Sequence, residues 1–182
     1  MPRFEVNGHA LYYEIHGDPQ RPPLVLLHHG LGAAKEWGPQ IAAFSQRYRV
    51  IAFDRWGYGR ADPRERFAYG YLLSDTGESI ALLDALQVRD AYVLGHSDGG
   101  TIALLLASQR PDLVRAMVVE AAHIYYEPRI HEGISAMLDK VRASRMVQGY
   151  LASLHGERGR ALAEEWLTHW LNPDNAPLAL VE

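Results

Sequence analysis

Ser97 lies in a short pattern that could perform nucleophilic chemistry. The pattern, Gly95-His96-Ser97-Asp98-Gly99, comes after a short apolar run and before a long one. In a sharp turn from a strand into a helix, glycines at these positions avoid the collision that a Cβ atom would cause. Such a turn strains the serine backbone, exposes the hydroxyl and directs helix N-terminal N–H groups toward it. The pattern therefore predicts a nucleophile at Ser97, although patterns this short also occur by chance.

A second glycine-rich segment, residues 28–32, could supply the anion site that acyl transfer requires. It comes directly after the apolar run 24–27. Glycines let a loop bring its amides close to a substrate. The backbone N–H groups of Leu31 and of Asp98, the residue after the nucleophile, are the predicted oxyanion donors. The alternative is that residues 28–32 only connect a strand to a helix.

The elements expected around these two loops alternate between strands and helices. Residues 4–6 and 11–15 flank an Asn-Gly turn and predict a hairpin. Further strands are expected at 24–27, 49–53, 91–94 and 114–120, and helices near Lys35, at 75–86 with Asp75 as N-cap, and at 101–109. This order predicts an α/β fold, a three-layer sandwich whose mostly parallel sheet has helices on both faces.

The pattern changes after residue 121. Residues 128–150 and 158–171 are expected to form amphipathic helices with no strand between them. Helices inserted there would cover the carboxyl edge of the sheet, where open α/β sheets bind ligands. We therefore interpret residues 1–122 as the N-terminal portion of a core and residues 123–182 as a helical lid segment, with the core not completed.

Composition narrows the class of protein. The net charge of -4 gives no electrostatic reason to expect a nucleic acid or an anionic membrane as partner. The chain has no cysteine, no apolar leader and no apolar run long enough to cross a bilayer. No histidine or carboxylate spacing predicts a metal site. We expect one cytoplasmic domain that acts on a small-molecule substrate.

Three motifs in one order resemble those of the α/β-hydrolase superfamily. Residues 26–32 resemble its oxyanion loop, residues 54–59 the loop after the next strand, and residues 95–100 its nucleophile elbow. The resemblance extends from Phe4 to about Leu171 and points to the lid-bearing esterase and carbon–carbon hydrolase branch. It implies an acyl-enzyme on Ser97, oxyanion amides at Leu31 and Asp98, and no cofactor.

The resemblance also implies a departure. In the superfamily the triad acid and the histidine follow the nucleophile on later strands, whereas the residues after Val119 show no further strand pattern. The acid and the histidine are therefore expected to be absent and activity impaired. The chain would be a truncated product, a fragment or one half of a noncovalent pair.

Local residues could substitute for the two groups. His123 follows the strand 114–120 and is the candidate base, and Glu120 at the strand end is the candidate acid. The alternative for Glu120 is a buried carboxylate held by N–H groups. Asp54 and Arg55 are expected to brace their loop by a salt bridge rather than to touch substrate.

Candidate binding residues surround the predicted nucleophile. They are Gly30, His29, His96, Tyr125, Tyr126 and Trp166, with Tyr150 and Trp170 as further aromatic candidates. An aromatic lining would favour a small to medium apolar ester, lactone or cleavable diketone. Aromatic side chains in such helices also often form only the core.

The sequence leaves two alternative functions open and suggests one protein partner. The chain could be a noncatalytic binding module that keeps the fold, or a cofactor-free haloperoxidase or oxygenase on the same fold. If later strands are missing, the strand 114–120 is an exposed apolar edge. Such an edge pairs readily with another chain, so it predicts a homodimer.

Overall fold

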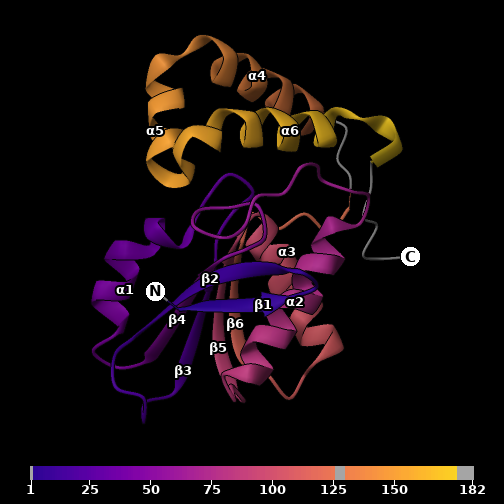
Figure 1. Ribbon diagram of the computed structural model, residues 1–182. Helices are drawn as coiled ribbons and strands as arrows, with labels where there is room; N and C mark the ends of the chain where they lie inside the picture. The colour runs from indigo at the N-terminus through magenta and orange to yellow at the C-terminus, as the bar shows by residue number, and fades with distance from the viewer. Residues whose placement is uncertain (1, 126–129, 176–182) are drawn as a thin grey trace.

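The computed structural model describes residues 2–125 and 130–175 and forms one six-stranded sheet (Figure 1). Its order is β1-β2-β4-β3-β5-β6. The strands are β1 Arg3–Val6, β2 His9–His16, β3 Pro23–Leu27, β4 Arg49–Asp54, β5 Ala91–His96 and β6 Val114–Glu120. β2 pairs antiparallel with β1 and with β4, and the other neighbours are parallel. The predicted hairpin and the predicted mostly parallel sheet are confirmed.

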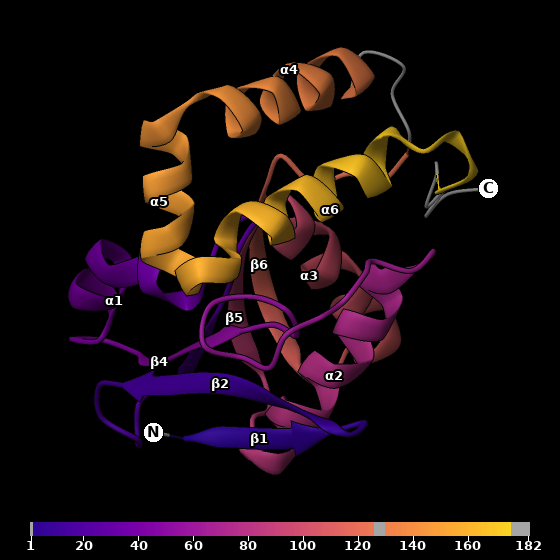
Figure 2. The same ribbon diagram turned by 45° about the horizontal axis from the view of Figure 1, so that its top comes forward.

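Helices cover both faces of the sheet. They are α1 Gly38–Phe44, α2 Tyr71–Ala85, α3 Asp98–Gln109, α4 Ile130–Ala143, α5 Arg145–His155 and α6 Gly159–Leu171, with 3₁₀ turns η1 Ala34–Trp37, η2 Gly156–Arg158 and η3 Pro173–Asn175. A small apolar cluster joins η1 and α1 to one face, while α2 and α3 pack in a larger cluster on the other. The three-layer α/β sandwich is confirmed (Figure 2).

Three predicted helix boundaries on this core are wrong. α2 begins at Tyr71 rather than Asp75, because Gly70 before it has φ 72° and turns the chain into the helix. Asp75 lies buried inside α2, so it cannot cap it. α3 begins at Asp98 instead of residue 101. The helix expected near Lys35 is a 3₁₀ turn followed by α1.

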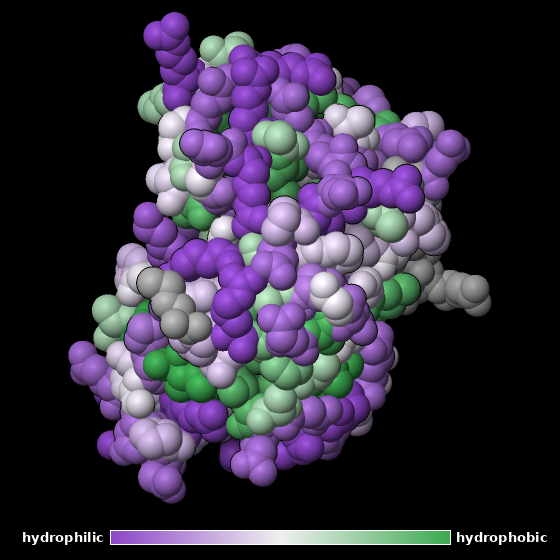
Figure 3. Space-filling model, in the orientation of Figure 1, coloured by the Kyte–Doolittle hydropathy of each residue, from purple (hydrophilic) through white to green (hydrophobic). Residues whose placement is uncertain are grey.

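The predicted helix over residues 128–150 is also wrong, because two helices divide its described part. Ser144 is extended, with ψ 113°, and its side chain accepts a hydrogen bond from the Val147 N–H. Ser144 therefore ends α4 and caps α5. We call α4–α6 the helical segment. It lies above the rest of the molecule in Figure 1, and the face of it that Figure 3 shows is mostly hydrophilic.

At the other end of the sheet, β6 has no neighbouring strand on its outer side among the described residues. β6 is the last strand in the sheet order, and most of its side chains are exposed. The expected exposed apolar edge is therefore present. Within residues 2–125 and 130–175 no helix is long and apolar enough to cross a membrane.

Candidate active site

Ser97 lies at the tight turn between β5 and α3. Its φ of 54° and ψ of -119° put a side-chain-bearing residue in a strained region of backbone space. A Cβ atom on Gly95 would collide with the Gly99 carbonyl, and one on Gly99 would collide with the Leu27 carbonyl of β3. The turn therefore requires glycine on both sides of Ser97, as the spacing predicts.

His123 lies beside the Ser97 hydroxyl. Its Nε2 atom is 3.5 Å from the Ser97 Oγ atom. The Thr101 hydroxyl holds the His123 backbone, because it accepts from the N–H at 3.0 Å and donates to the carbonyl at 2.9 Å. The Trp170 ring lies 5.2 Å from the imidazole. The structure thus brings together the predicted nucleophile and the candidate base.

Glu120 is expected from the sequence to be either the candidate acid or a buried carboxylate held by N–H groups. Its side chain is exposed, so the predicted alternative of a buried carboxylate is wrong. The residue contributes its backbone instead, because its carbonyl accepts from the Ser97 N–H at 2.8 Å. Among the described residues, no hydrogen bond or ion pair joins a carboxylate to the His123 ring.

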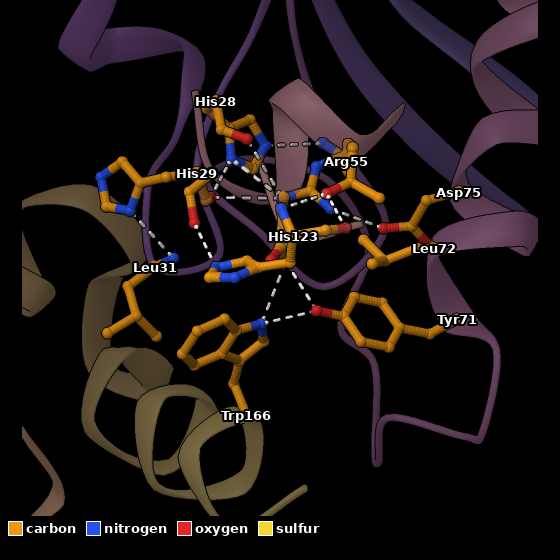
Figure 4. A network of polar contacts seen from close by, with 12 residues as sticks. His28, His29, Leu31, Arg55, Tyr71, Leu72, Asp75, His123 and Trp166 are labelled. Atoms are coloured by element: carbon orange, nitrogen blue, oxygen red, sulfur yellow. Dashed lines mark hydrogen bonds and ion pairs between the residues drawn. The ribbon is translucent and has the colours of Figure 1, made fainter. Parts of the chain in front are cut away.

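The Leu31 amide, a predicted oxyanion donor, already has an acceptor. It donates to His29 Nδ1 at 3.2 Å (Figure 4). His29 Nε2 lies 3.2 Å from Glu36. Although burial alone would raise it, hydrogen bonds from His29 and Tyr150 lower the pKa of Glu36. An oxyanion bound to Leu31 would therefore replace the hydrogen bond to His29.

The Asp98 side chain anchors the helical segment to the elbow. This buried carboxylate accepts from the Tyr71 hydroxyl at 2.7 Å and from Trp166 Nε1 at 3.1 Å. The Trp166 indole also donates to the Tyr71 oxygen at 3.0 Å (Figure 4). The Trp170 indole donates to the same oxygen at 3.2 Å. Burial and the neighbouring Asp98 charge raise the pKa of Tyr71, so its hydroxyl stays protonated as a donor. Sequence reasoning gave Asp98 only a backbone role.

Trp166 also contacts the glycine-rich loop. A Cβ atom on Gly30 would collide with the Trp166 ring, so the loop and the indole lie in direct contact. Trp166 is almost fully buried. Both predicted binding residues therefore lie near the elbow, but in this structure the indole packs against the loop.

Arg55 joins the loops around the site. The predicted bracing by ion pairs is present, because Arg55 pairs with Asp75 and Asp54 pairs with Arg60. The guanidinium is buried, donates to Asp75 at 2.8 Å and lies 3.8 Å from Asp98. It also donates to the carbonyls of His28 and His29. Asp54 also accepts from the backbone N–H groups of Ala34 and Arg60.

His155 at the end of α5 bridges the two glycine-rich loops. Its Nδ1 atom accepts from the Gly59 N–H at 2.9 Å, and its Nε2 atom lies 2.9 Å from the Leu31 carbonyl. A carbonyl only accepts and an N–H only donates, so the ring must be neutral with its proton on Nε2. Burial lowers the pKa of His155 below its ordinary value.

Acid is expected to weaken this bridge. Because the pKa is lowered in the folded protein, the stability from neutral His155 is present above the unfolded pKa and lost as the pH falls through the folded value. Asp54 and Glu36 oppose the lowered pKa, and Arg158 supports it. The free energy of unfolding of the unchanged chain should fall between about pH 7.5 and pH 5 more steeply than that of His155→Gln.

The comparison between variants is needed because burial also lowers the pKa of His28 and His169. His28 and His169 therefore also make the free energy of unfolding fall as the pH falls, and the His155→Gln variant keeps this contribution. His131→Gln changes an exposed histidine on α4 and should keep the slope of the unchanged chain. If the free energy of unfolding depends on pH equally in all three proteins, His155 does not contribute to the acid sensitivity.

Three of the four remaining candidate residues, His96, Tyr125 and Tyr150, lie in the described part of the chain. The His96 ring lies 5.3 Å from the His29 ring. Tyr125 is exposed, and Tyr126 lies outside the described residues. Tyr150 is half exposed and donates to Glu36. In the part of the chain that the structure describes, no group of three or more side chains could hold a metal ion.

Several known proteins are similar to this chain in sequence. Serine hydrolase BPHL of Mus musculus is 32% identical over 169 residues, which cover 89% of this chain and 57% of the mouse protein. A putative carbamate hydrolase, RutD, of Stutzerimonas stutzeri is 36% identical over 110 residues, 59% of this chain and 41% of that protein. The chain spans about half the length of these curated relatives.

Solved structures agree in fold. The enol-lactonase from Burkholderia xenovorans superposes with a TM-score of 0.69 at 24% identity, over 97% of this chain and 75% of that one. A hydrolase from Pseudomonas aeruginosa gives 0.71 at 22% identity, over 98% and 71%. A family model described as the alpha/beta hydrolase fold matches residues 23–163. The chain therefore belongs to the α/β-hydrolase family.

Proposed function

We propose that this chain is a serine hydrolase in which Ser97 attacks the carbonyl carbon of a small to medium apolar ester, lactone or cleavable diketone. The observation that carries the proposal is the strained Ser97 turn with His123 Nε2 3.5 Å from the hydroxyl oxygen. The names of similar proteins support this chemistry: one is a serine hydrolase, and the substrates named for a putative carbamate hydrolase and an enol-lactonase both contain a carbonyl group.

The proposed reaction, written for an ester, has two steps. In the first, the Ser97 oxygen bonds to the carbonyl carbon while its proton passes to His123 Nε2, and the departing alkoxide takes that proton as its bond breaks. In the second, water gives a proton to His123 and its oxygen displaces Ser97, which regains a proton. The Leu31 and Asp98 N–H groups would stabilise the oxyanion in both steps.

Slow turnover is part of the proposal. A catalytic histidine needs an acceptor on its second nitrogen to hold its tautomer and to stabilise the charged ring. Within residues 2–125 and 130–175 the His123 ring has no such carboxylate partner. We therefore propose that this chain acylates more readily than it turns over, and that α4–α6 act as a lid through their contacts with the elbow.

A fluorophosphonate probe tests the nucleophile. The probe's phosphorus should bond to Ser97 Oγ with loss of fluoride, and peptide mass spectrometry should find one label, on Ser97. Ser97→Ala should take up none. A folded unchanged chain that stays unlabelled at Ser97, or that is labelled equally at other serines, would overturn the proposal and favour a noncatalytic binding module.

Replacing His123 should slow this labelling. A general base contributes on the order of 10² to 10⁴ in rate, and the unsupported His123 should lie at the low end. His123→Ala is therefore expected to be labelled about 10²-fold more slowly. His131→Ala, at an exposed position on α4, is the matched control and should label at the original rate. Equal rates for both variants would exclude His123 as the base.

A further inference from the structure

The Trp166 indole contacts both sides of the predicted oxyanion site. A Cβ atom on Gly30, the residue before Leu31, would collide with the indole, so the ring packs directly on the backbone of the oxyanion loop. On the other side, Trp166 Nε1 donates to Asp98 Oδ2 at 3.1 Å, and Asp98 follows Ser97. A carbonyl oxygen bound between the Leu31 and Asp98 N–H groups would therefore place its carbonyl carbon beside this ring.

Hydrogen bonds hold the indole in this position. Figure 4 shows Trp166 between Leu31 and Tyr71, and its Nε1 atom lies 3.0 Å from the Tyr71 oxygen. The Tyr71 hydroxyl in turn donates to Asp98 at 2.7 Å. Trp166 is almost fully buried. The ring therefore cannot turn away from the oxyanion loop unless it breaks hydrogen bonds to two buried groups of the core.

Trp170 extends the same aromatic surface toward the candidate base. It lies one turn after Trp166 on α6, and the two ring centroids are 5.8 Å apart. The Trp170 ring is 5.2 Å from the His123 ring, whose Nε2 atom is 3.5 Å from Ser97 Oγ. The two indoles thus extend from the oxyanion loop to His123 and close the α6 side of the site.

We propose that Trp166 limits the length of the acyl group that Ser97 accepts, so that the chain prefers esters of short carboxylic acids such as acetyl esters. This inference rests on the proposed function, because it requires acylation of Ser97. The contact between the indole and Gly30 leaves no space for an acyl chain between the ring and the loop. A longer chain on this side would have to displace a buried, hydrogen-bonded side chain.

The effect of Trp166 should depend on acyl length and little on the leaving group. Each methylene group that fits into an apolar pocket, or is excluded from it, changes the rate by on the order of 10-fold. Trp166→Leu keeps an apolar side chain of smaller volume and so makes space for several methylene groups. The variant should therefore gain rate with long acyl chains relative to short ones.

The burst of p-nitrophenolate released on acylation measures this preference. Ser97 Oγ bonds to the carbonyl carbon and p-nitrophenolate leaves, so the acetate and hexanoate esters differ only in the acyl group. The unchanged chain should react about 10-fold faster with the acetate, and Trp166→Leu should raise the hexanoate-to-acetate rate ratio about 10-fold. Trp56→Leu is the matched control and should keep the original ratio, because Trp56 lies in the loop after β4, stacked on the His9 ring at 4.1 Å.

A second variant protects the test against misfolding of Trp166→Leu. Trp166→Phe keeps an aromatic ring but is smaller than the indole and cannot donate to Asp98 or Tyr71. It should raise the hexanoate-to-acetate ratio in the same direction by a smaller factor. Circular dichroism and thermal unfolding show which variants are folded, and the ratio is compared among those.

The outcomes distinguish failure of this inference from failure of the proposed function. An unchanged chain whose burst with the acetate is no larger than that of Ser97→Ala would overturn both. A Ser97-dependent burst with the acetate, combined with an unaltered ratio in the folded Trp166 variants, would overturn the acyl-length inference alone. An unchanged chain that reacts as fast with the hexanoate as with the acetate would do the same.

Discussion

Arg55→Met is expected to lower the free energy of unfolding by about 3–5 kcal/mol, the cost of removing one partner from a buried ion pair. Arg55 is almost fully buried, donates to Asp75 and lies near Asp98. Methionine fills much of the same volume but leaves the Asp98 charge without its cation. It also leaves the His28 and His29 carbonyls without the donor they share. Urea unfolding of the two proteins measures the loss.

Arg66→Met is the matched control for this prediction. Arg66 is exposed in the loop before α2, so its replacement should change the stability by less than about 0.5 kcal/mol. The double variant Arg55→Met, Asp75→Leu should be more stable than the sum of the single losses predicts, because both single variants lose the same Arg55–Asp75 pair and the double variant loses it only once. A loss under about 1 kcal/mol in Arg55→Met would show that the buried guanidinium contributes little net stability.

The sheet and the two loops could be predicted because their signals are local. A continuous apolar run such as residues 24–27 is typical of a strand covered on both faces, and β3 is such a strand. Gly95 and Gly99 could be interpreted from spacing alone, since the collisions they avoid involve their own turn and the adjacent strand. The position of Ser97 follows from these two facts.

The contacts that hold the site together could not be predicted, because their partners lie far apart in the chain. Asp75 satisfies the local pattern of an N-cap, but burial beside Arg55 and Arg64 gives it another role. Nothing near Asp98 in the sequence indicates that Trp166 donates to its carboxylate. The one available signal was an acidic residue in a turn that must be buried.

The contacts of His155, a residue of the helical segment, could not be predicted for the same reason. The amphipathic pattern places it on a helix, where a histidine is most often solvent-exposed or packed. Its two bonds reach Gly59 and Leu31, which belong to different loops. Through these contacts the helical segment and both loops form one hydrogen-bonded unit. A substitution in the segment that breaks them is therefore expected to alter the position of the oxyanion loop.

Gly99 in the elbow should not tolerate a larger side chain. Gly99→Ala is expected to lower the free energy of unfolding by more than about 3 kcal/mol, because the new Cβ atom would collide with the Leu27 and His28 carbonyls. These are backbone atoms at the end of a central strand, so they cannot move aside as a side chain could. Thermal and urea unfolding should both show the loss.

Alanine variants of two other glycines, with less crowded surroundings, serve as controls for Gly99→Ala. Gly100→Ala places its Cβ atom 3.1 Å from side-chain atoms of Ala122 and Val119 and 3.2 Å from the Glu120 carbonyl oxygen. These contacts are tight but longer than those at Gly99, so a smaller loss is expected. Gly149→Ala meets nothing within 4 Å on the exposed face of α5 and should gain about 0.5–1 kcal/mol through helix propensity. The expected stability order is therefore Gly149→Ala, then Gly100→Ala, then Gly99→Ala. A Gly99→Ala protein as stable as Gly100→Ala would mean that the turn can open without cost, and the strained Ser97 conformation would then not be enforced by its neighbours.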